Sequence, residues 1–239
     1  MASEEDLLPL YKHPAPHREV MRRYRVHLAQ QNFRVSVVLS IITFLISLGI
    51  NIFAINFASE HASNSVTDII LSNTPIFNVD AWFVYGTWLM IAFITALCVL
   101  HPKRIPFTLY SLAVFWIVRS IFTSLTHIGP YPVPIPSGDW SATTIKLFFG
   151  GDLFFSGHTG VPFLLALMYW HEPRLRNIFL AWSAFFAVVV LLGHLHYSID
   201  VLSAFFITYT VYHITLWFFP KDRDLFLSET PQQQAFLGL

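Results

Sequence analysis

Six apolar segments of the sequence are long enough, or nearly so, to cross a lipid bilayer. A membrane-spanning helix needs about 20 mostly apolar residues. Because 55% of the residues are hydrophobic and only 12% are charged, a soluble fold could not cover this much apolar side chain with polar surface. The sequence therefore predicts an all-α integral membrane protein built as a bundle of six transmembrane helices. We expect these helices at residues 35–59, 81–100, 106–126, 153–170, 177–193 and 201–219.

Positively charged residues are concentrated in every second loop between these predicted helices. The 14 Lys and Arg residues lie almost entirely in the N-terminal arm, in the loops after the second and fourth helices, and in the C-terminal tail. Lys146 is the exception in the opposite loops, and Arg119 lies within the third helix. Because basic loops stay in the cytoplasm, we expect both termini there. Residues 1–34 would then form a cytoplasmic basic arm, 35–219 a transmembrane catalytic domain and 220–239 a cytoplasmic tail.

Two segments outside the predicted helices each allow two interpretations. Residues 17–34 could form a basic helix that lies on anionic lipid, or a solvated and partly frayed tail. The loop at 127–145 has prolines at every second position from 130 to 136, which stiffens it toward an extended shape. This loop could be a lid on the outer side or a plain connector.

The composition excludes several kinds of function. The 14 basic and 14 acidic residues leave no net charge, so nucleic-acid binding by bulk electrostatics is not expected. A single cysteine, Cys98, excludes an intrachain disulfide. No HExxH motif or other paired ligand spacing is present, so we predict neither a metal site nor a cofactor. The oligomeric state cannot be read from the sequence.

Ionisable residues from three distant segments fall at one predicted depth, near the outer face. His158 lies near the outer end of the fourth helix, while His196 and Asp200 lie at the turn between the fifth and sixth helices. Arg119 lies about 20 Å from the cytoplasmic edge of the third helix. Ionisable groups inside an apolar chain are candidates for function. Only His213 lies much deeper, and we expect it to form an interhelical hydrogen bond.

The spacing of these residues suits chemistry on an anionic group. His196 and Asp200 are four residues apart, so a helix would place them on one face, where the carboxylate fixes the imidazole tautomer. Ser156 can cap a helix, Gly157 allows a ligand close to the backbone, and the positive end of the helix favours an anion. Arg119 offers planar donors for phosphate oxygens. The alternatives are a His bonded to a capping Asp, an ordinary N-cap, and an Arg that reaches the outer headgroups.

Two motifs carry a resemblance to a known family. The segment GGDLFFSGHT at 150–159, followed by HYSIDV at 196–201, resembles the sphingomyelin synthase-like branch of the type 2 phosphatidic acid phosphatase (PAP2) superfamily. The patterns of that branch are close to C/G-G-D-x-x-x-S-G-H-T and H-Y-T/S-x-D-V. The segment around Arg119 is similar to a further motif of the branch. Asp68 is similar in position to an acidic residue of an early outer-loop motif.

The resemblance implies a lipid head-group phosphotransferase, and the charge pattern predicts that its active site lies on the extracytoplasmic face. Phosphocholine or phosphoethanolamine would pass from a glycerophospholipid to a ceramide-like or other hydroxyl lipid through a phosphohistidine. His196 would be the nucleophile, Asp200 would orient it, and His158 would be the general acid and base. With water as the acceptor, the same residues would make a lipid phosphate phosphatase or phospholipase C-like hydrolase, and this alternative stays open. The predicted substrate- and phosphate-binding residues are Arg119, Ser156, Gly157, Thr159, Asp152 and Tyr197.

Overall fold

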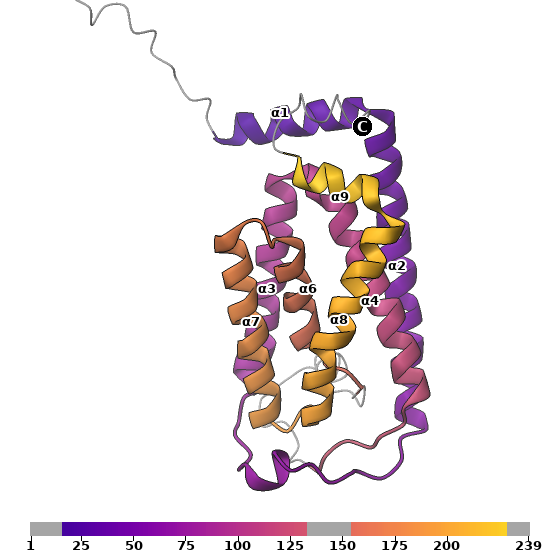
Figure 1. Ribbon diagram of the computed structural model, residues 1–239, viewed down its shortest axis with the longest axis vertical. Helices are drawn as coiled ribbons and strands as arrows, with labels where there is room; N and C mark the ends of the chain where they lie inside the picture. Colours follow the sequence, from indigo (N-terminus) through magenta and orange to yellow (C-terminus); the bar gives the residue numbers. More distant parts are fainter. Residues whose placement is uncertain (1–15, 133–153, 229–239) are drawn as a thin grey trace, which may run out of the picture.

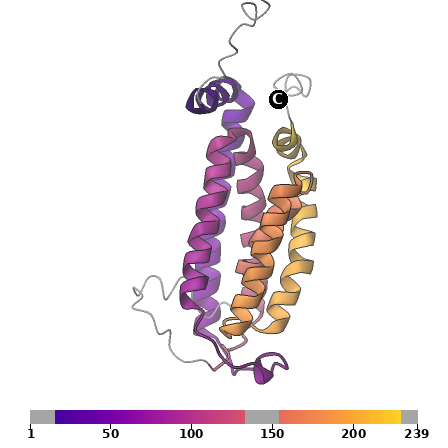
Figure 2. The same cartoon turned by 90° about the vertical axis from the view of Figure 1, so that its left-hand side faces the viewer.

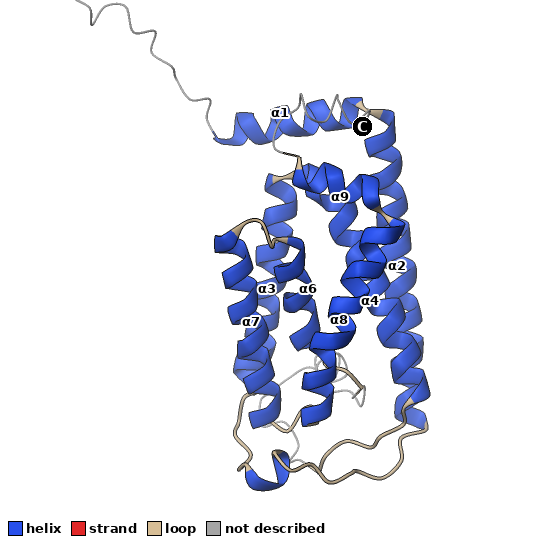
Figure 3. Cartoon of the chain, viewed as in Figure 1, coloured by secondary structure: helices blue, strands red, loops and turns tan. Residues whose placement is uncertain are grey.

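The computed structural model describes residues 16–132 and 154–228, and every regular element in these two ranges is a helix (Figure 3). Among them, five helices are long and apolar enough to cross a membrane. They run side by side, with the shorter helix α6 packed between them (Figure 1). The predicted all-helical membrane fold is therefore confirmed. The long helices are α2 (Gln31–Glu60), α3 (Asp80–Leu100), α4 (Ile105–Leu125), α7 (Pro173–Leu192) and α8 (Ser198–Phe218).

The fourth predicted span is shorter than expected. Helix α6 (Gly157–Met168) has 12 residues, which rise about 18 Å and would not cross a hydrocarbon core of about 30 Å. Its start is defined by Ser156, whose side chain accepts a hydrogen bond from the Thr159 amide. The five long helices begin and end within four residues of their predicted bounds. Five of the six predicted segments thus form helices that are long and apolar enough to cross a membrane, and the sixth span stays a prediction.

Helix α2 buries small and polar residues and exposes large apolar ones. Its small and polar residues, among them Ser40, Ser47 and Asn51, are buried in a stripe toward α4. Its large side chains point outward, and Phe53 is 71% exposed. The Asn51 side chain accepts a hydrogen bond from the Ser120 hydroxyl at 3.4 Å. Small residues inside and large apolar residues outside are typical of helices that associate in a bilayer.

The basic segments meet at one end of the bundle. Helices α1 (Pro16–Ala29) and α9 (Pro220–Leu227) both lie there, with α1 across the end of the long helices (Figures 1 and 2). Both contact the short helix η3 (Pro102–Arg104). The loops that the charge pattern assigns to the cytoplasm are therefore together. The helical form of α1 favours the interfacial-helix interpretation of the arm, and the buried Leu225 and Phe226 attach the start of the C-terminal tail to the bundle.

Two loops pair with each other at the opposite end. The Ser63 amide donates to the His127 carbonyl at 2.8 Å, and the Gly129 amide donates to the Asn64 carbonyl at 3.3 Å. A Cβ at Gly129 would lie 2.0 Å from the Ser63 carbonyl oxygen, so this contact needs glycine. The loop between α2 and α3 also contains the short helix η2 (Leu71–Asn73). Of the loop at 127–145, which could be a lid or a connector, residues 133–145 lie outside the described residues.

Candidate active site

His196 and Asp200 meet at the start of α8, as their spacing predicts. His196 Nδ1 lies 3.5 Å from Asp200 Oδ2, and the two side chains are 6% and 0% exposed. The same carboxylate oxygen accepts the Tyr197 amide at 2.9 Å, a bond that closes the first turn of α8. The carboxylate is therefore held beside the imidazole by the backbone of its own motif.

A backbone hydrogen bond joins the two sequence motifs. The Ser156 amide donates to the Asp200 carbonyl at 3.1 Å, so the first turn of α6 is tied to the first turn of α8. Gly157 follows the cap, and a Cβ there would lie 3.3 Å from Arg119 Nε and 3.4 Å from the Trp116 ring. Glycine at this position thus lets the guanidinium group lie against the start of α6.

Arg119 is held inside the bundle. Its side chain is buried, and its Nε donates to the Phe155 carbonyl at 3.1 Å. Phe155 has a φ of +24°, which is uncommon for an aromatic residue and stands directly before the Ser156 cap. The guanidinium carbon lies 5.8 Å from the centre of the Trp116 ring. An arginine that reaches out to the lipid headgroups would be exposed, so this alternative is wrong.

His158 completes a cluster of three residues that can carry positive charge. Its ring packs against Phe83 and Phe186, with centroid separations of 4.2 and 5.7 Å. His158 follows Gly157, which lies against the Arg119 side chain, and stands two residues after Ser156, whose amide is bonded to the Asp200 carbonyl. Residues from α4, α6 and the turn before α8 therefore converge on one place. An imidazole paired with a carboxylate, a second imidazole and a guanidinium group together suit the transfer of a negatively charged phosphoryl group.

The other predicted phosphate-binding residues lie in packing positions. Thr159 is fully buried, and its carbonyl accepts the Ser183 hydroxyl at 2.9 Å. The Tyr197 hydroxyl donates to the Gly129 carbonyl at 2.8 Å and accepts the Val66 amide at 3.2 Å. These bonds make Tyr197 a link between the α2–α3 loop, the segment after α4 and the start of α8. Asp152 lies outside the described residues.

Asp68 has a clearer place in the structure than its sequence context suggests. One carboxylate oxygen accepts both the amide and the hydroxyl of Ser198 at 2.7 Å. The other accepts the amides of Ile70 and Leu71 at 2.8 and 3.1 Å. Burial alone would raise the pKa of Asp68, but the hydrogen bonds from Ser198, Leu71 and Ile70 hold that pKa below its usual value. Asp68 therefore attaches the turn that contains His196 to the α2–α3 loop. In the sequence, only the loose motif similarity indicated that Asp68 has a role.

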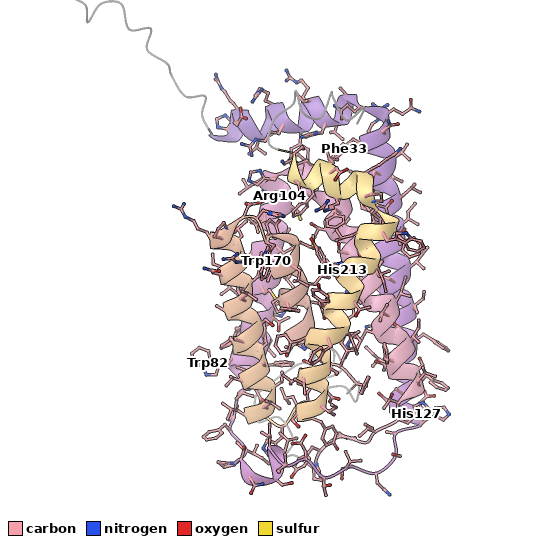
Figure 4. All side chains as sticks on the ribbon, viewed as in Figure 1. Phe33, Trp82, Arg104, His127, Trp170 and His213 are labelled. Carbon is pink, nitrogen blue, oxygen red and sulfur yellow. The ribbon has the colours of Figure 1, made fainter. Side chains whose placement is uncertain are left out.

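Three further histidines have other surroundings. His194 Nε2 lies 3.1 Å from the Thr74 carbonyl oxygen, and His127 Nε2 lies 3.0 Å from the Ser124 carbonyl oxygen at the end of α4 (Figure 4). His213 is exposed on α8, and its ring neighbour at 4.5 Å, Tyr209, belongs to the same helix. No interhelical hydrogen bond of His213 occurs among residues 16–132 and 154–228, so that expectation is wrong for the described part of the chain.

One comparison with known proteins gives a match. Residues 150–217 match the family model described as PAP2 superfamily C-terminal. The matched range contains both the SGHT and the HYSID motifs, and therefore three of the residues that converge in the structure. No curated protein and no solved structure matches the chain.

Proposed function

From the PAP2 superfamily membership that this match supports, we propose that the protein is a lipid head-group phosphotransferase. The match supports chemistry on lipid phosphate groups in general. The observation that carries the finer proposal is the convergence of the His196–Asp200 pair, His158 and Arg119 at the starts of α6 and α8. The head group is phosphocholine or phosphoethanolamine, the donor is a glycerophospholipid, and the acceptor is a ceramide-like or other hydroxyl lipid.

The reaction has two displacements at phosphorus. In the first, the Nε2 atom of His196 attacks the phosphodiester while Asp200 keeps the Nδ1 proton in place. The bond from phosphorus to the diacylglycerol oxygen breaks, and His158 donates a proton to that oxygen. In the second, His158 removes the proton from the acceptor hydroxyl, whose oxygen attacks the phosphohistidine. The phosphorus–nitrogen bond then breaks, and both histidines return to their starting states.

Fixed charges stabilise the transition states of both steps. Arg119 places a permanent positive charge beside Gly157, at the positive end of the α6 dipole. Because the site is largely enclosed by side chains, these charges act through a medium of low dielectric constant and are stronger than in water. The 3.5 Å separation of His196 and Asp200 is long for a hydrogen bond, and such catalytic contacts commonly shorten when the substrate binds.

Aromatic packing around the site favours an alcohol over water as the acceptor. His158 lies against Phe83 and Phe186, and Phe155 beneath the α6 cap packs against Phe115 at 5.4 Å. These rings exclude water from the reacting atoms, so a hydroxyl lipid held in place competes well. If water reaches the phosphohistidine, the same residues act as a lipid phosphate phosphatase or phospholipase C-like hydrolase, the second candidate. We place the site on the extracytoplasmic face, away from the basic end.

The experiment uses purified protein in liposomes with labelled phosphatidylcholine or phosphatidylethanolamine, with and without ceramide or diacylglycerol. Mass spectrometry should detect a new phospholipid that depends on the acceptor. His196→Ala and His158→Ala should lose this product, while His213→Ala, an exposed histidine on the same bundle, should retain it. Release of the head-group phosphate at one rate with and without acceptor would favour the hydrolase. An unchanged product level in His196→Ala would contradict the assignment of the nucleophile.

A further inference from the structure

An apolar groove runs between α3 and α7 on the outside of the bundle. Its volume is about 660 Å³, within the range of about 300–1,000 Å³ that is typical of small-molecule sites. On α3 it is lined by Trp82, Tyr85 and Gly86, and Figure 4 labels Trp82 on the outside of the bundle. On α7 it is lined by Ala181 and Phe185, among others, and its lining includes no charged side chain.

The residue pattern of the two helices explains the groove. Positions 82, 85 and 89 on α3 and positions 178, 181, 182 and 185 on α7 recur at helical spacing, so one lining stripe on each helix faces the other. Small residues between the large rings create the depth. A Cβ at Gly86 would lie 3.1 Å from the Phe185 ring, which shows how closely that ring approaches the α3 backbone.

One layer of aromatic rings separates the groove from the candidate active site. Phe185, in the groove wall, lies 5.3 Å from Phe186, measured between ring centroids. Phe186 lies 6.4 Å from Phe83, and both rings contact the His158 imidazole. Two side chains, Phe185 and Phe186, therefore lie between the groove and the residue proposed to protonate the leaving group.

We propose that this groove binds one hydrocarbon chain of the lipid substrate, so that its phosphate group is presented to His158 from the α3–α7 side. The groove opens on the apolar outer surface of two membrane-spanning helices, where lipid tails are the surrounding medium. An uncharged aromatic lining suits a hydrocarbon chain and offers nothing to a phosphate head group. This inference rests on the proposed function, because it assigns a binding region to the substrate of that site.

The test fills the groove and compares long with short substrate chains. Ala181→Trp places an indole in the groove, and Ala184→Trp makes the same change at an exposed residue of α7 outside the lining. We expect Ala181→Trp to lower kcat/KM for a dipalmitoyl donor by about tenfold or more, while a dihexanoyl donor changes less than about twofold. Ala184→Trp should leave both values unchanged. An equal effect of Ala181→Trp on both donors, or no effect, would overturn the proposal.

A second measurement uses the wild-type protein alone. A phosphatidylcholine with a photoreactive diazirine in the middle of one acyl chain should label peptides from α3 and α7 that contain the groove residues. Labelling confined to other helices would overturn the proposal, as would crosslinking of two copies of the chain through this groove. If the protein turns over neither donor, the proposed function fails, and the labelling pattern still decides whether the groove binds a lipid chain.

Discussion

Replacing Asp68 by alanine should disturb the candidate active site without removing a reacting group. The Asp68 carboxylate accepts four hydrogen bonds, two from Ser198 and one each from the Ile70 and Leu71 amides. Ser198 lies midway in sequence between His196 and Asp200. Without the carboxylate, the turn that sets the distance between these two side chains loses its attachment to the α2–α3 loop.

The size of the effect follows from these bonds. A hydrogen bond to a charged group contributes about 1.5–3 kcal/mol, but four bonds to one carboxylate do not add independently. We expect Asp68→Ala to lower the free energy of unfolding by about 2–4 kcal/mol, because three backbone amides, among them that of the buried Leu71, lose their partner. Asp68→Asn keeps the shape and one acceptor oxygen, but its NH₂ group faces donors on the other side. Its loss should be about half as large.

The assay combines thermal denaturation in detergent with turnover in liposomes. The apparent Tm should fall in the order wild type, Asp68→Asn, Asp68→Ala, and kcat should fall in the same order. Ser198→Ala, which removes only the hydroxyl donor, should have the smallest effect. Unchanged Tm and kcat in Asp68→Ala would refute the reasoning. A large loss of kcat at an unchanged Tm would instead indicate that Asp68 takes part in the chemistry.

The stabilisation by Asp68 should depend on pH in one direction. The folded protein holds the pKa of Asp68 below its ordinary value of 3.8, to which it returns on unfolding. The unfolded state therefore binds the proton more tightly, and the contribution of Asp68 to stability is complete above pH 3.8 and is lost as the pH falls through the folded pKa. The Tm difference between wild type and Asp68→Asn should be full at pH 7 and should narrow below about pH 4. A difference that widens on acidification would contradict the sign of this shift.

Further substitutions test the site and the topology. Gly157→Ala should lower kcat by about tenfold or more, since its Cβ would lie 3.3 Å from Arg119 Nε, and an unaltered rate would show that this approach is unimportant. Arg119→Lys should lower kcat by about a hundredfold, because an ammonium group cannot replace the planar donors of a guanidinium group. Kinetics close to those of the wild type would show that Arg119 contributes only its charge. In a Cys98→Ser background, a membrane-impermeant maleimide should label Ser63→Cys on intact cells and Arg174→Cys only after permeabilisation. The reverse pattern would invert the proposed orientation.

The sequence alone determined the membrane class and the bounds of five helices, because apolar length and charge are local properties of the chain. The helix at 31–60 ends one residue from its predicted end, but it begins four residues before its predicted start, because the helix continues into the polar residues that precede the apolar segment. The pairing of His196 with Asp200 could be predicted from their spacing of four residues, although His196 lies just before α8 and not within it. For α6, the apolar segment at 153–170 is longer than the helix, because the Ser156 cap determines where the helix begins.

Only the tertiary structure decided which residues from different helices share the site. Whether Arg119 reaches the headgroups or the start of α6 depends on how α4 is rotated against its neighbours, and this rotation depends on the packing of the whole bundle. The hydrogen bond that the Ser198 amide donates to Asp68 joins residues 130 positions apart, so no local pattern predicts it. Tyr197 belongs to the same motif as His196 and Asp200, yet its hydroxyl forms hydrogen bonds with two loops. These partners depend on the position of the hydroxyl in space, which the spacing of the motif does not predict.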